Sequence, residues 1–158
     1  MSEASDEFVA VTGGCLCGAV RYEAHANLDD AYYCHCKTCR KSSGAPVEVG
    51  VTVKPGTLIF LNEDPKFFDS SPIGRRGFCR HCGSRLIWMS PSKPEWTNLC
   101  AGSLDHPERV SPKQHLCVES QLPWFSLADD LPRTRSDDLP GLKEEWASVG
   151  LTHDGQPL

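Results

Sequence analysis

Long apolar runs are missing from this sequence. No stretch approaches the roughly 20 consecutive apolar residues that a membrane-spanning helix needs. The first residues, MSEASDEFVAV, contain no basic segment followed by an apolar one, and a secretory signal peptide has both. We therefore expect neither a membrane protein nor an exported one, and we expect the chain to be cytoplasmic.

An excess of positive charge is missing as well. The 158 residues include 16 Lys and Arg against 21 Asp and Glu, which gives a formal net charge of −5. Proteins that bind nucleic acids without regard to sequence attract the phosphates through clustered Lys and Arg. Nucleic acid is therefore not an expected partner.

Internal repeats and a long helical period are missing too. Instead, 12 Pro and 13 Gly divide the chain into short pieces, and the length fits a single domain. Short β-rich runs at this spacing predict a mainly β fold with little helix, either an open, twisted antiparallel sheet or a sandwich. The runs are Phe8–Thr12, Ala19–Ala24, Ala31–Cys34, Val47–Val53, Thr57–Leu61, Gly77–Phe78, Arg85–Met89, Thr97–Ala101 and Gln114–Val118.

Helix is predicted at two places only, Lys37–Ser43 and Asp137–Ser148. The segment Leu127–Leu158 is rich in Asp, Pro and Arg and has few apolar residues, which is typical of a peripheral tail. We therefore divide the chain into a flexible N-terminus at 1–8, a cysteine-containing domain at 9–128 and a C-terminal tail at 129–158.

Cysteine, by contrast, is abundant. A chain without an export signal that carries nine cysteines is expected to use them as metal ligands, because the cytosol keeps thiols reduced. The alternative is four disulfides and one free thiol. It is disfavoured because the three crowded cysteines Cys34, Cys36 and Cys39 are awkward to pair locally.

Two cysteine pairs resemble the halves of one closed zinc site. Zinc prefers four tetrahedral ligands, with thiolate bonds of about 2.3 Å. Glycine follows the pair Cys15/Cys17 and the pair Cys79/Cys82, and glycine readily adopts the positive φ that turns backbone N–H groups towards the sulfurs. Four protein ligands leave no open position, so this site is expected to be structural.

The other group, Cys34, Cys36 and Cys39, offers three ligands and no obvious fourth. Three protein ligands with an exchangeable fourth position are typical of catalytic zinc. The spacing leaves two alternatives open. The first is a zinc ribbon formed by Cys36/Cys39 together with Cys79/Cys82. The second is that the group forms another closed site, in which the fourth ligand is one of His35, His81, Cys100, Cys117 and His115.

Five ordered blocks lie between Gly13 and Phe125: GGCLCGAVRYE, CHCKTCRKSSGA, RRGFCRHCGSRLIW, AGSLDHPE and PWF. In these blocks the sequence resembles the glutathione-dependent formaldehyde-activating enzyme family, which includes centromere protein V. It implies an Mss4-like fold stapled by zinc, and two zinc ions per chain. The structural zinc would be held by Cys15, Cys17, Cys79 and Cys82, and the catalytic zinc by Cys34, Cys36 and Cys39.

The resemblance also implies an activity. It is a zinc-dependent carbon–sulfur lyase or synthase that joins glutathione, or a related thiol, to a small aldehyde, as in S-hydroxymethylglutathione synthase. The alternative is a non-catalytic, zinc-stabilised binding or chaperone-like module. Cys100 and Cys117 lie in apolar runs and are interpreted as buried core thiols.

Two groups of cations flank the cysteines in the sequence. Lys37, Arg40 and Lys41 are candidates to offset the negative charge of three thiolates. A second basic group is a candidate to hold substrate carboxylates, although solvated surface charge is the commoner role and the one preferred here. Its members are Arg75, Arg76, Arg80 and Arg85.

Overall fold

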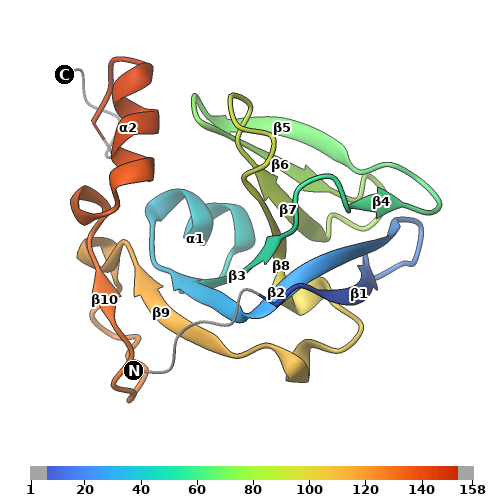
Figure 1. The fold of residues 1–158 in the computed structure, drawn as a ribbon, viewed down its shortest axis with the longest axis horizontal. Coiled ribbons are helices and arrows are strands. Elements are labelled where there is room, and N and C mark those ends of the chain that lie inside the picture. The colour runs from blue at the N-terminus through green and yellow to red at the C-terminus, as the bar shows by residue number, and fades with distance from the viewer. Residues whose placement is uncertain (1–6, 153–158) are drawn as a thin grey trace.

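The computed structural model describes residues 7–152, and the fold is mainly β, as predicted (Figure 1). Most of the predicted N-terminus at 1–8 and residues 153–158 of the predicted tail lie outside that part. The strands are β1 Val9–Gly14, β2 Arg21–Cys34, β3 Glu48–Val53, β4 Ile59–Phe60, β5 Lys66–Ser71, β6 Gly74–Phe78, β7 Arg85–Met89, β8 Thr97–Cys100, β9 Pro112–Leu116 and β10 Arg133–Thr134. The helices are α1 Lys37–Ser43, α2 Pro140–Ser148 and the short 3-10 turns η1 Ala101–Ser103, η2 Pro107–Arg109, η3 Val118–Ser120 and η4 Ser136–Asp138.

The ten strands form one sheet whose main path runs β10-β9-β2-β3-β8-β7-β6-β5, with β1 and β4 both paired to β2. Most neighbours are antiparallel, but β9 runs parallel to both β2 and β10. The sheet is therefore mixed. The parallel pairing is what brings the end of β9 beside the end of β2, where Cys34 lies.

Strand β2 is the centre of the arrangement, because it pairs with β1, β3, β4 and β9. The sequence predicted two strands here, Ala19–Ala24 and Ala31–Cys34, separated by residues 25–30. The chain instead stays extended through this stretch, and the pairing with β3 shifts register between Asn27 and Tyr32. A bulge of this kind absorbs extra residues without ending the strand, and Asn27 and Leu28 are buried in it.

The core lies between the curled faces of this sheet. Its fully buried side chains include Tyr22, Val51, Leu86, Ile87 and Leu99, which come from β2, β3, β7 and β8. Within the described residues, no helix is both long and apolar enough to cross a membrane.

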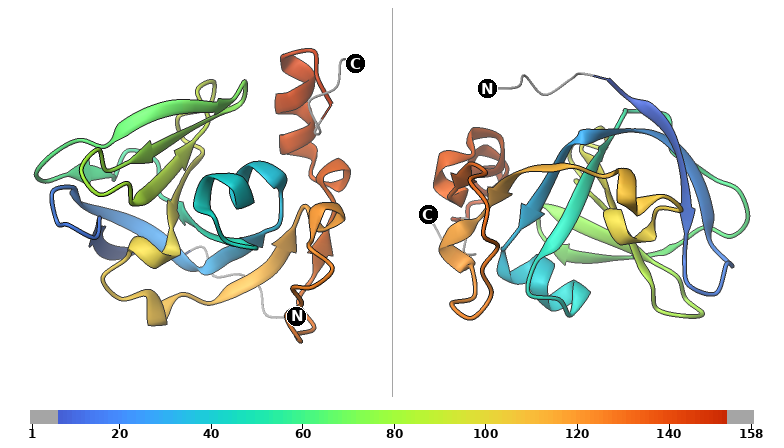
Figure 2. Two further views of the ribbon diagram at one scale, coloured as in Figure 1. Left: turned by 180° about the vertical axis from the view of Figure 1, so that it is seen from behind. Right: turned by 90° about the horizontal axis from the view of Figure 1, so that it is seen from below.

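Along the longest axis, α2 and β10 lie at one end, the β5–β6 hairpin lies towards the other, and α1 lies between them (Figures 1 and 2). The predicted helix Lys37–Ser43 is confirmed, and the predicted helix Asp137–Ser148 begins later, at Pro140. Contacts join the segment after residue 128 to the rest. Arg133 pairs in register with His115, and Glu145 is buried, with its carboxylate 2.7 Å from the Ser92 hydroxyl.

Candidate metal centres

The first cysteine group lies where two turns meet. Cys15 and Cys17 follow β1 in a turn that Gly18 completes with a φ of 80°, and the N–H of Val20 donates to Cys15 Sγ at 3.2 Å. Cys79 follows β6, and Gly83, with a φ of 74°, donates its N–H to the carbonyl of Cys79 at 2.8 Å. Both turns therefore use glycine in the left-handed region, where a Cβ is disfavoured.

The sulfurs of this group are spaced as a metal requires. Cys15, Cys17, Cys79 and Cys82 place their sulfurs within 4.8 Å of one another, with Cys15 and Cys17 3.6 Å apart and Cys17 and Cys79 3.7 Å apart. Tetrahedral ligands with bonds of about 2.3 Å give sulfur separations of about 3.8 Å. The set therefore fits one tetrahedral metal ion, and it joins residues that lie 62 positions apart.

The second cysteine group lies between β2 and α1. Cys34 ends β2, Cys36 is the N-cap of α1, and Cys39 lies in its first turn. The Cys36 sulfur accepts a hydrogen bond from the Cys39 N–H at 3.3 Å. The three sulfurs lie within 4.8 Å of one another, and in residues 7–152 this group has no fourth cysteine, histidine or carboxylate member.

Hydrogen bonding among the three thiols separates their acidities. The pKa of Cys36 is lowered to about 2 by hydrogen bonds from the thiols of Cys34 and Cys39. The pKa of Cys34 is raised well above its usual value, first of all by its hydrogen bond with the Cys117 thiol and then by those with its neighbours in the group. Cys36 therefore carries the first negative charge when the group ionises.

Two buried histidines and a partly exposed carboxylate support the loop that holds these cysteines. Nε2 of His35 lies 2.8 Å from Nδ1 of His115, and Nε2 of His115 lies 3.1 Å from the Asp129 carboxylate. Because a carboxylate only accepts, His115 donates to Asp129 and accepts from His35. His35 then points its hydrogen-bonded edge at β9, and its other nitrogen, Nδ1, is buried without a partner among the described residues.

Arginines lie close to the second group, but not the ones that the sequence favoured for charge balance. Lys37 and Lys41 are exposed, and Arg40 donates to the carbonyl of His35 at 3.4 Å. Arg76, in contrast, is 1% exposed and donates from Nη2 to Cys39 Sγ at 3.2 Å.

The surface interpretation of the second basic group was wrong for half of its members. Arg76 is buried, and Arg85 forms a mostly buried bidentate ion pair with Glu48. Arg75 and Arg80 do carry exposed ion pairs, with Asp69 and Glu63. The alternation along β6 is the signal that separates Arg75 from Arg76, because neighbours on a strand point to opposite faces.

The remaining cysteines belong to neither group. Cys100 is mostly buried beside Glu48, its thiol 3.5 Å from a carboxylate oxygen, and burial raises its pKa to about 12. Cys117 is 4% exposed and has a φ of 59°, the only positive φ of a non-glycine residue in the described chain. The buried-thiol interpretation therefore holds for Cys117, which in addition contacts Cys34.

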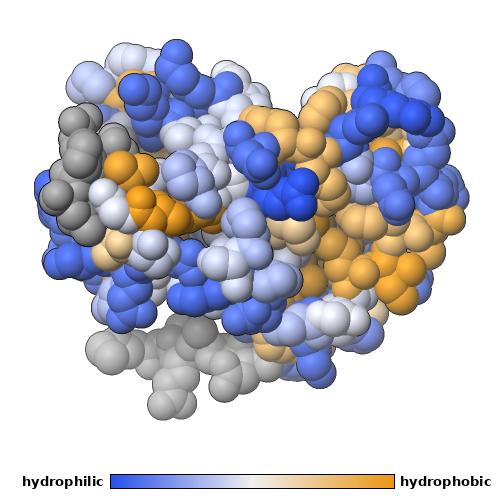
Figure 3. All heavy atoms as spheres, turned by 90° about the horizontal axis from the view of Figure 1, so that it is seen from above, coloured by the Kyte–Doolittle hydropathy of each residue, from blue (hydrophilic) through white to orange (hydrophobic). Residues whose placement is uncertain are grey.

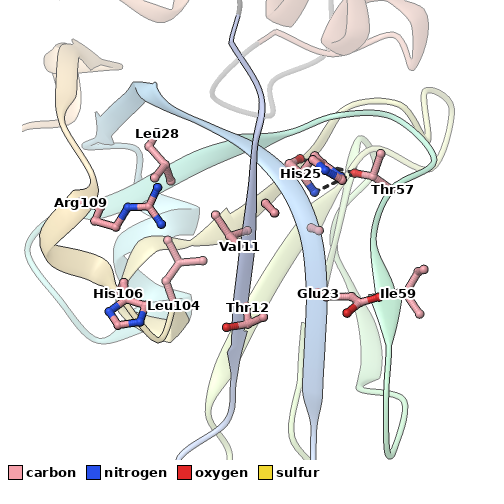
Figure 4. A pocket seen from close by; sticks show the side chains of 12 residues that line it. Val11, Thr12, Glu23, His25, Leu28, Thr57, Ile59, Leu104, His106 and Arg109 are labelled. Atoms are coloured by element: carbon pink, nitrogen blue, oxygen red, sulfur yellow. Dashed lines mark hydrogen bonds between the residues drawn. The ribbon is translucent and has the colours of Figure 1, made fainter.

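Two pockets are present in the described chain, and Cys34, Cys36 and Cys39 line neither of them. One, of about 490 Å³, has an apolar floor that includes Val11, Leu28 and Leu104. Figure 4 shows His106 and Arg109 on one side of β1 and His25 on the other. No cysteine lines this pocket.

The other pocket, of about 560 Å³, is bordered by Cys15, Cys100 and two arginines, Arg21 and Arg85. Both arginines are already paired with carboxylates, Arg21 with Asp105 and Arg85 with Glu48. Their charges are therefore not available to an anionic ligand.

Comparisons with known proteins show the family of the chain. The profile of the family described as glutathione-dependent formaldehyde-activating enzyme matches residues 10–120. An uncharacterized lyase of Schizosaccharomyces pombe is 35% identical over 128 residues, which cover 80% of this chain and 92% of that protein. A crystal structure of a Rhodobacter sphaeroides protein is similar in fold, with a TM-score of 0.50 and 23% identity over 78% of this chain and 99% of that one. The chain therefore belongs to the glutathione-dependent formaldehyde-activating enzyme family.

Proposed function

We propose that the protein is a zinc-dependent carbon–sulfur lyase that forms and cleaves the adduct of a thiol, glutathione or a relative, with a small aldehyde such as formaldehyde. The observation that carries this proposal is the second cysteine group. Cys34, Cys36 and Cys39 converge with three sulfurs, and the group has no fourth ligand in the described chain. The name of the family and the lyase title of the 35% identical relative point the same way.

We propose zinc as the metal of both groups, because the donors are all sulfur and thiolates suit tetrahedral zinc. Cys15, Cys17, Cys79 and Cys82 would hold a structural ion, and Cys34, Cys36 and Cys39 a catalytic one. Free thiols at all nine cysteines suit a reducing compartment, and we propose a cytoplasmic location on that ground.

The proposed reaction requires the second group to activate a thiol. Zinc bound there would lower the pKa of a thiol that occupies the fourth position. The thiolate sulfur would attack the aldehyde carbon, so that a carbon–sulfur bond forms while the π bond of the carbonyl breaks, and the aldehyde oxygen would take up the proton that the thiol has lost. Cleavage is the reverse, with the proton returned and the thiolate as leaving group.

The cations of α1 are suited to receive the carboxylates of glutathione. Lys37 and Lys41 are exposed beside Cys36 and Cys39, and neither forms an ion pair within the described chain. Arg21 and Arg85, by comparison, are committed to carboxylates of the protein itself. We therefore place the peptide part of the thiol along the exposed face of α1.

The test is NMR exchange spectroscopy on glutathione and formaldehyde at equilibrium. We expect the zinc-loaded protein to accelerate exchange between glutathione and its hydroxymethyl adduct, and Cys36→Ser to abolish the acceleration. Cys100→Ser is the matched control, because Cys100 is a partly buried thiol outside both groups. Exchange that is no faster with the zinc-loaded protein than without it would refute the proposed activity.

A non-catalytic binding module is the second candidate, and exposed apolar side chains favour it. Ile59 and Leu61 are each 52% exposed and Phe68 is 44% exposed. Figure 3 shows hydrophobic side chains gathered on the side of the molecule where β4 and β5 lie. A folded protein with both metals bound and no effect on the exchange would favour this second candidate.

A further inference from the structure

Arg76 is buried in a place where a cation needs a counter-charge. It lies in the middle of β6, in register with Phe68 on β5 and Trp88 on β7, and only 1% of it is exposed. Taking a guanidinium out of water is costly unless an anion and hydrogen-bond acceptors surround it. The residues around Arg76 must therefore supply negative charge.

The hydrogen bonds of Arg76 identify where that charge comes from. Its Nε donates to Ser42 Oγ at 2.9 Å, its Nη1 donates to the Ser70 hydroxyl, and its Nη2 donates to Cys39 Sγ at 3.2 Å. The two hydroxyls are neutral. The sulfur of Cys39 is the one partner of the three that can be an anion.

Carboxylates do not take this role. Within residues 7–152, no Asp or Glu oxygen lies within 4.0 Å of the Arg76 nitrogens. The nearby Glu48 is bound by Arg85 through both carboxylate oxygens, and Arg85 also donates to Ser42 at 2.6 Å. Ser42 thus ties the two arginines together, while Glu48 balances only Arg85.

The formal charges at the second cysteine group balance when Arg76 is included. A divalent metal held by three thiolates has a formal charge of −1, and the guanidinium of Arg76 brings the total to zero. We propose that Arg76 is a positioning residue of the Cys34–Cys36–Cys39 site, which neutralises the metal–thiolate centre through Cys39 and so makes its fourth position selective for an anionic sulfur ligand. This inference deepens the proposed function and rests on it for the metal.

Arg75, the neighbour of Arg76 on the same strand, does not contact the cysteine group. Arg75 points to the other face, where it pairs with Asp69 at 3.3 Å and lies over the ring of Phe67. A substitution at Arg75 changes the net charge of the protein by the same amount as one at Arg76. It does so without touching the cysteine group, and it is therefore the matched control.

The experiment uses the full-length protein with cobalt(II) in the second site, whose visible absorption reports the fourth ligand. The protein is titrated with 2-mercaptoethanol, which binds as an anionic thiolate, and with imidazole, which binds neutral. We expect wild-type protein to prefer the thiolate. We expect Arg76→Gln to weaken thiolate binding at least about tenfold and to leave imidazole binding within about threefold, whereas Arg76→Lys keeps most of the thiolate affinity and Arg75→Gln changes neither.

Three outcomes would overturn the inference. Equal weakening of both ligands in Arg76→Gln would show a merely structural role. An Arg75→Gln variant that loses thiolate affinity as much as Arg76→Gln would show an effect of net charge alone. If Arg76→Gln does not fold, the wild-type titration decides by itself, because a site that prefers imidazole to the thiolate contradicts the proposal.

The titration also separates this inference from the proposed function, since it involves no aldehyde and no turnover. Thiolate selectivity that depends on Arg76, in a protein that does not exchange formaldehyde adducts, would leave the inference standing and remove the activity. Exchange activity that is the same in Arg76→Gln as in the wild-type protein would remove the inference and leave the proposed activity standing.

Discussion

Nε2 of His35 lies 2.8 Å from Nδ1 of His115, with both imidazoles fully buried and their ring centroids 5.1 Å apart. The two residues are 80 positions apart in the sequence. Because His35 stands between Cys34 and Cys36, this contact fixes the loop of the second cysteine group to β9. Burial lowers the pKa of His35, which keeps the ring neutral and the hydrogen-bond direction fixed.

Asp129 is expected to stabilise the protein by holding His115 in one tautomer. Its hydrogen bond from His115 lowers the pKa of the Asp129 carboxyl. A carboxyl with a lowered folded pKa stabilises the protein fully above its unfolded pKa, about 3.9, and loses that contribution as the pH falls further. Asp129→Asn should therefore lower Tm at pH 7, and the difference from wild type should shrink below about pH 4.

Thermal melts followed by circular dichroism at several pH values measure this difference. The neighbouring Asp130→Asn is the control, because Asp130 is exposed. Equal effects of the two substitutions at pH 7 would mean that the histidine pair does not depend on Asp129.

The two cysteine groups should differ in what they do for stability. Cys79→Ser breaks a four-ligand set that joins distant turns, and structural zinc contributes on the order of 10 kcal/mol to the folding of small domains. Cys36→Ser removes a ligand from a loop already held by His35 and Arg76, so it should empty its site at a much smaller loss of Tm. Melts in which both variants are damaged equally would contradict this division.

Metal content should follow the same division. Elemental analysis of protein purified under reducing conditions without chelator should give two zinc ions per chain. Mild chelation should remove the ion at Cys34, Cys36 and Cys39 first, because three ligands hold a metal less firmly than four. One zinc per chain, with Cys34, Cys36 and Cys39 open to alkylation in the native protein, would refute the second metal site.

The turn at Gly83 should be sensitive to a single methyl group. Its φ of 74° is disfavoured for residues with a Cβ, although the space around it is open. Gly83→Ala should therefore cost roughly 1–2 kcal/mol through the backbone alone. Gly102→Ala is the control, because Gly102 also has open space but no positive φ. Urea unfolding measures both, and equal free energies of unfolding would disprove the argument.

The ion pairs of Arg85 and Arg21 should differ in how much they contribute to the free energy of unfolding. The side chains of Arg85 and Glu48 are 10% and 11% exposed, whereas those of Arg21 and Asp105 are 34% and 35% exposed. Glu48→Gln leaves a mostly buried guanidinium without its anion and should cost up to about 3–5 kcal/mol. Asp105→Asn should cost less than about 1 kcal/mol. Urea unfolding at pH 7 compares them, and a reversed order would refute the ranking.

Local patterns predicted local structure well. The strand at Arg85–Met89 and the helix at Lys37–Ser43 have the predicted bounds, because a short run of strand formers and the absence of strand formers are local signals. Strand β5, Lys66–Ser71, was missed. It is an edge strand with no alternation between apolar and polar residues, and its pairing with β6 determines it.

What the sequence could not supply was the environment of each side chain. The grouping of cysteines follows from short spacings and repeated glycines, whereas the partner of Arg76 lies 37 positions away and the partner of His35 lies 80 away. Parallel pairing of β9 with β2 brings His115 to the cysteine loop. No spacing rule in one sequence encodes that neighbour, so His115 could be named as a candidate but not placed.

The order of these residues along the chain has a consequence during synthesis. The ligands of the first group are complete once Cys82 has left the ribosome, whereas the loop of the second group is held by His115 and Asp129, which emerge later. Bacterial and eukaryotic ribosomes add about 5–20 residues per second, so a nascent chain spends some seconds with one metal site assembled and the other still without its support. If both groups bind metal as proposed, the first group can therefore take up its ion while the loop of the second group still lacks His115 and Asp129.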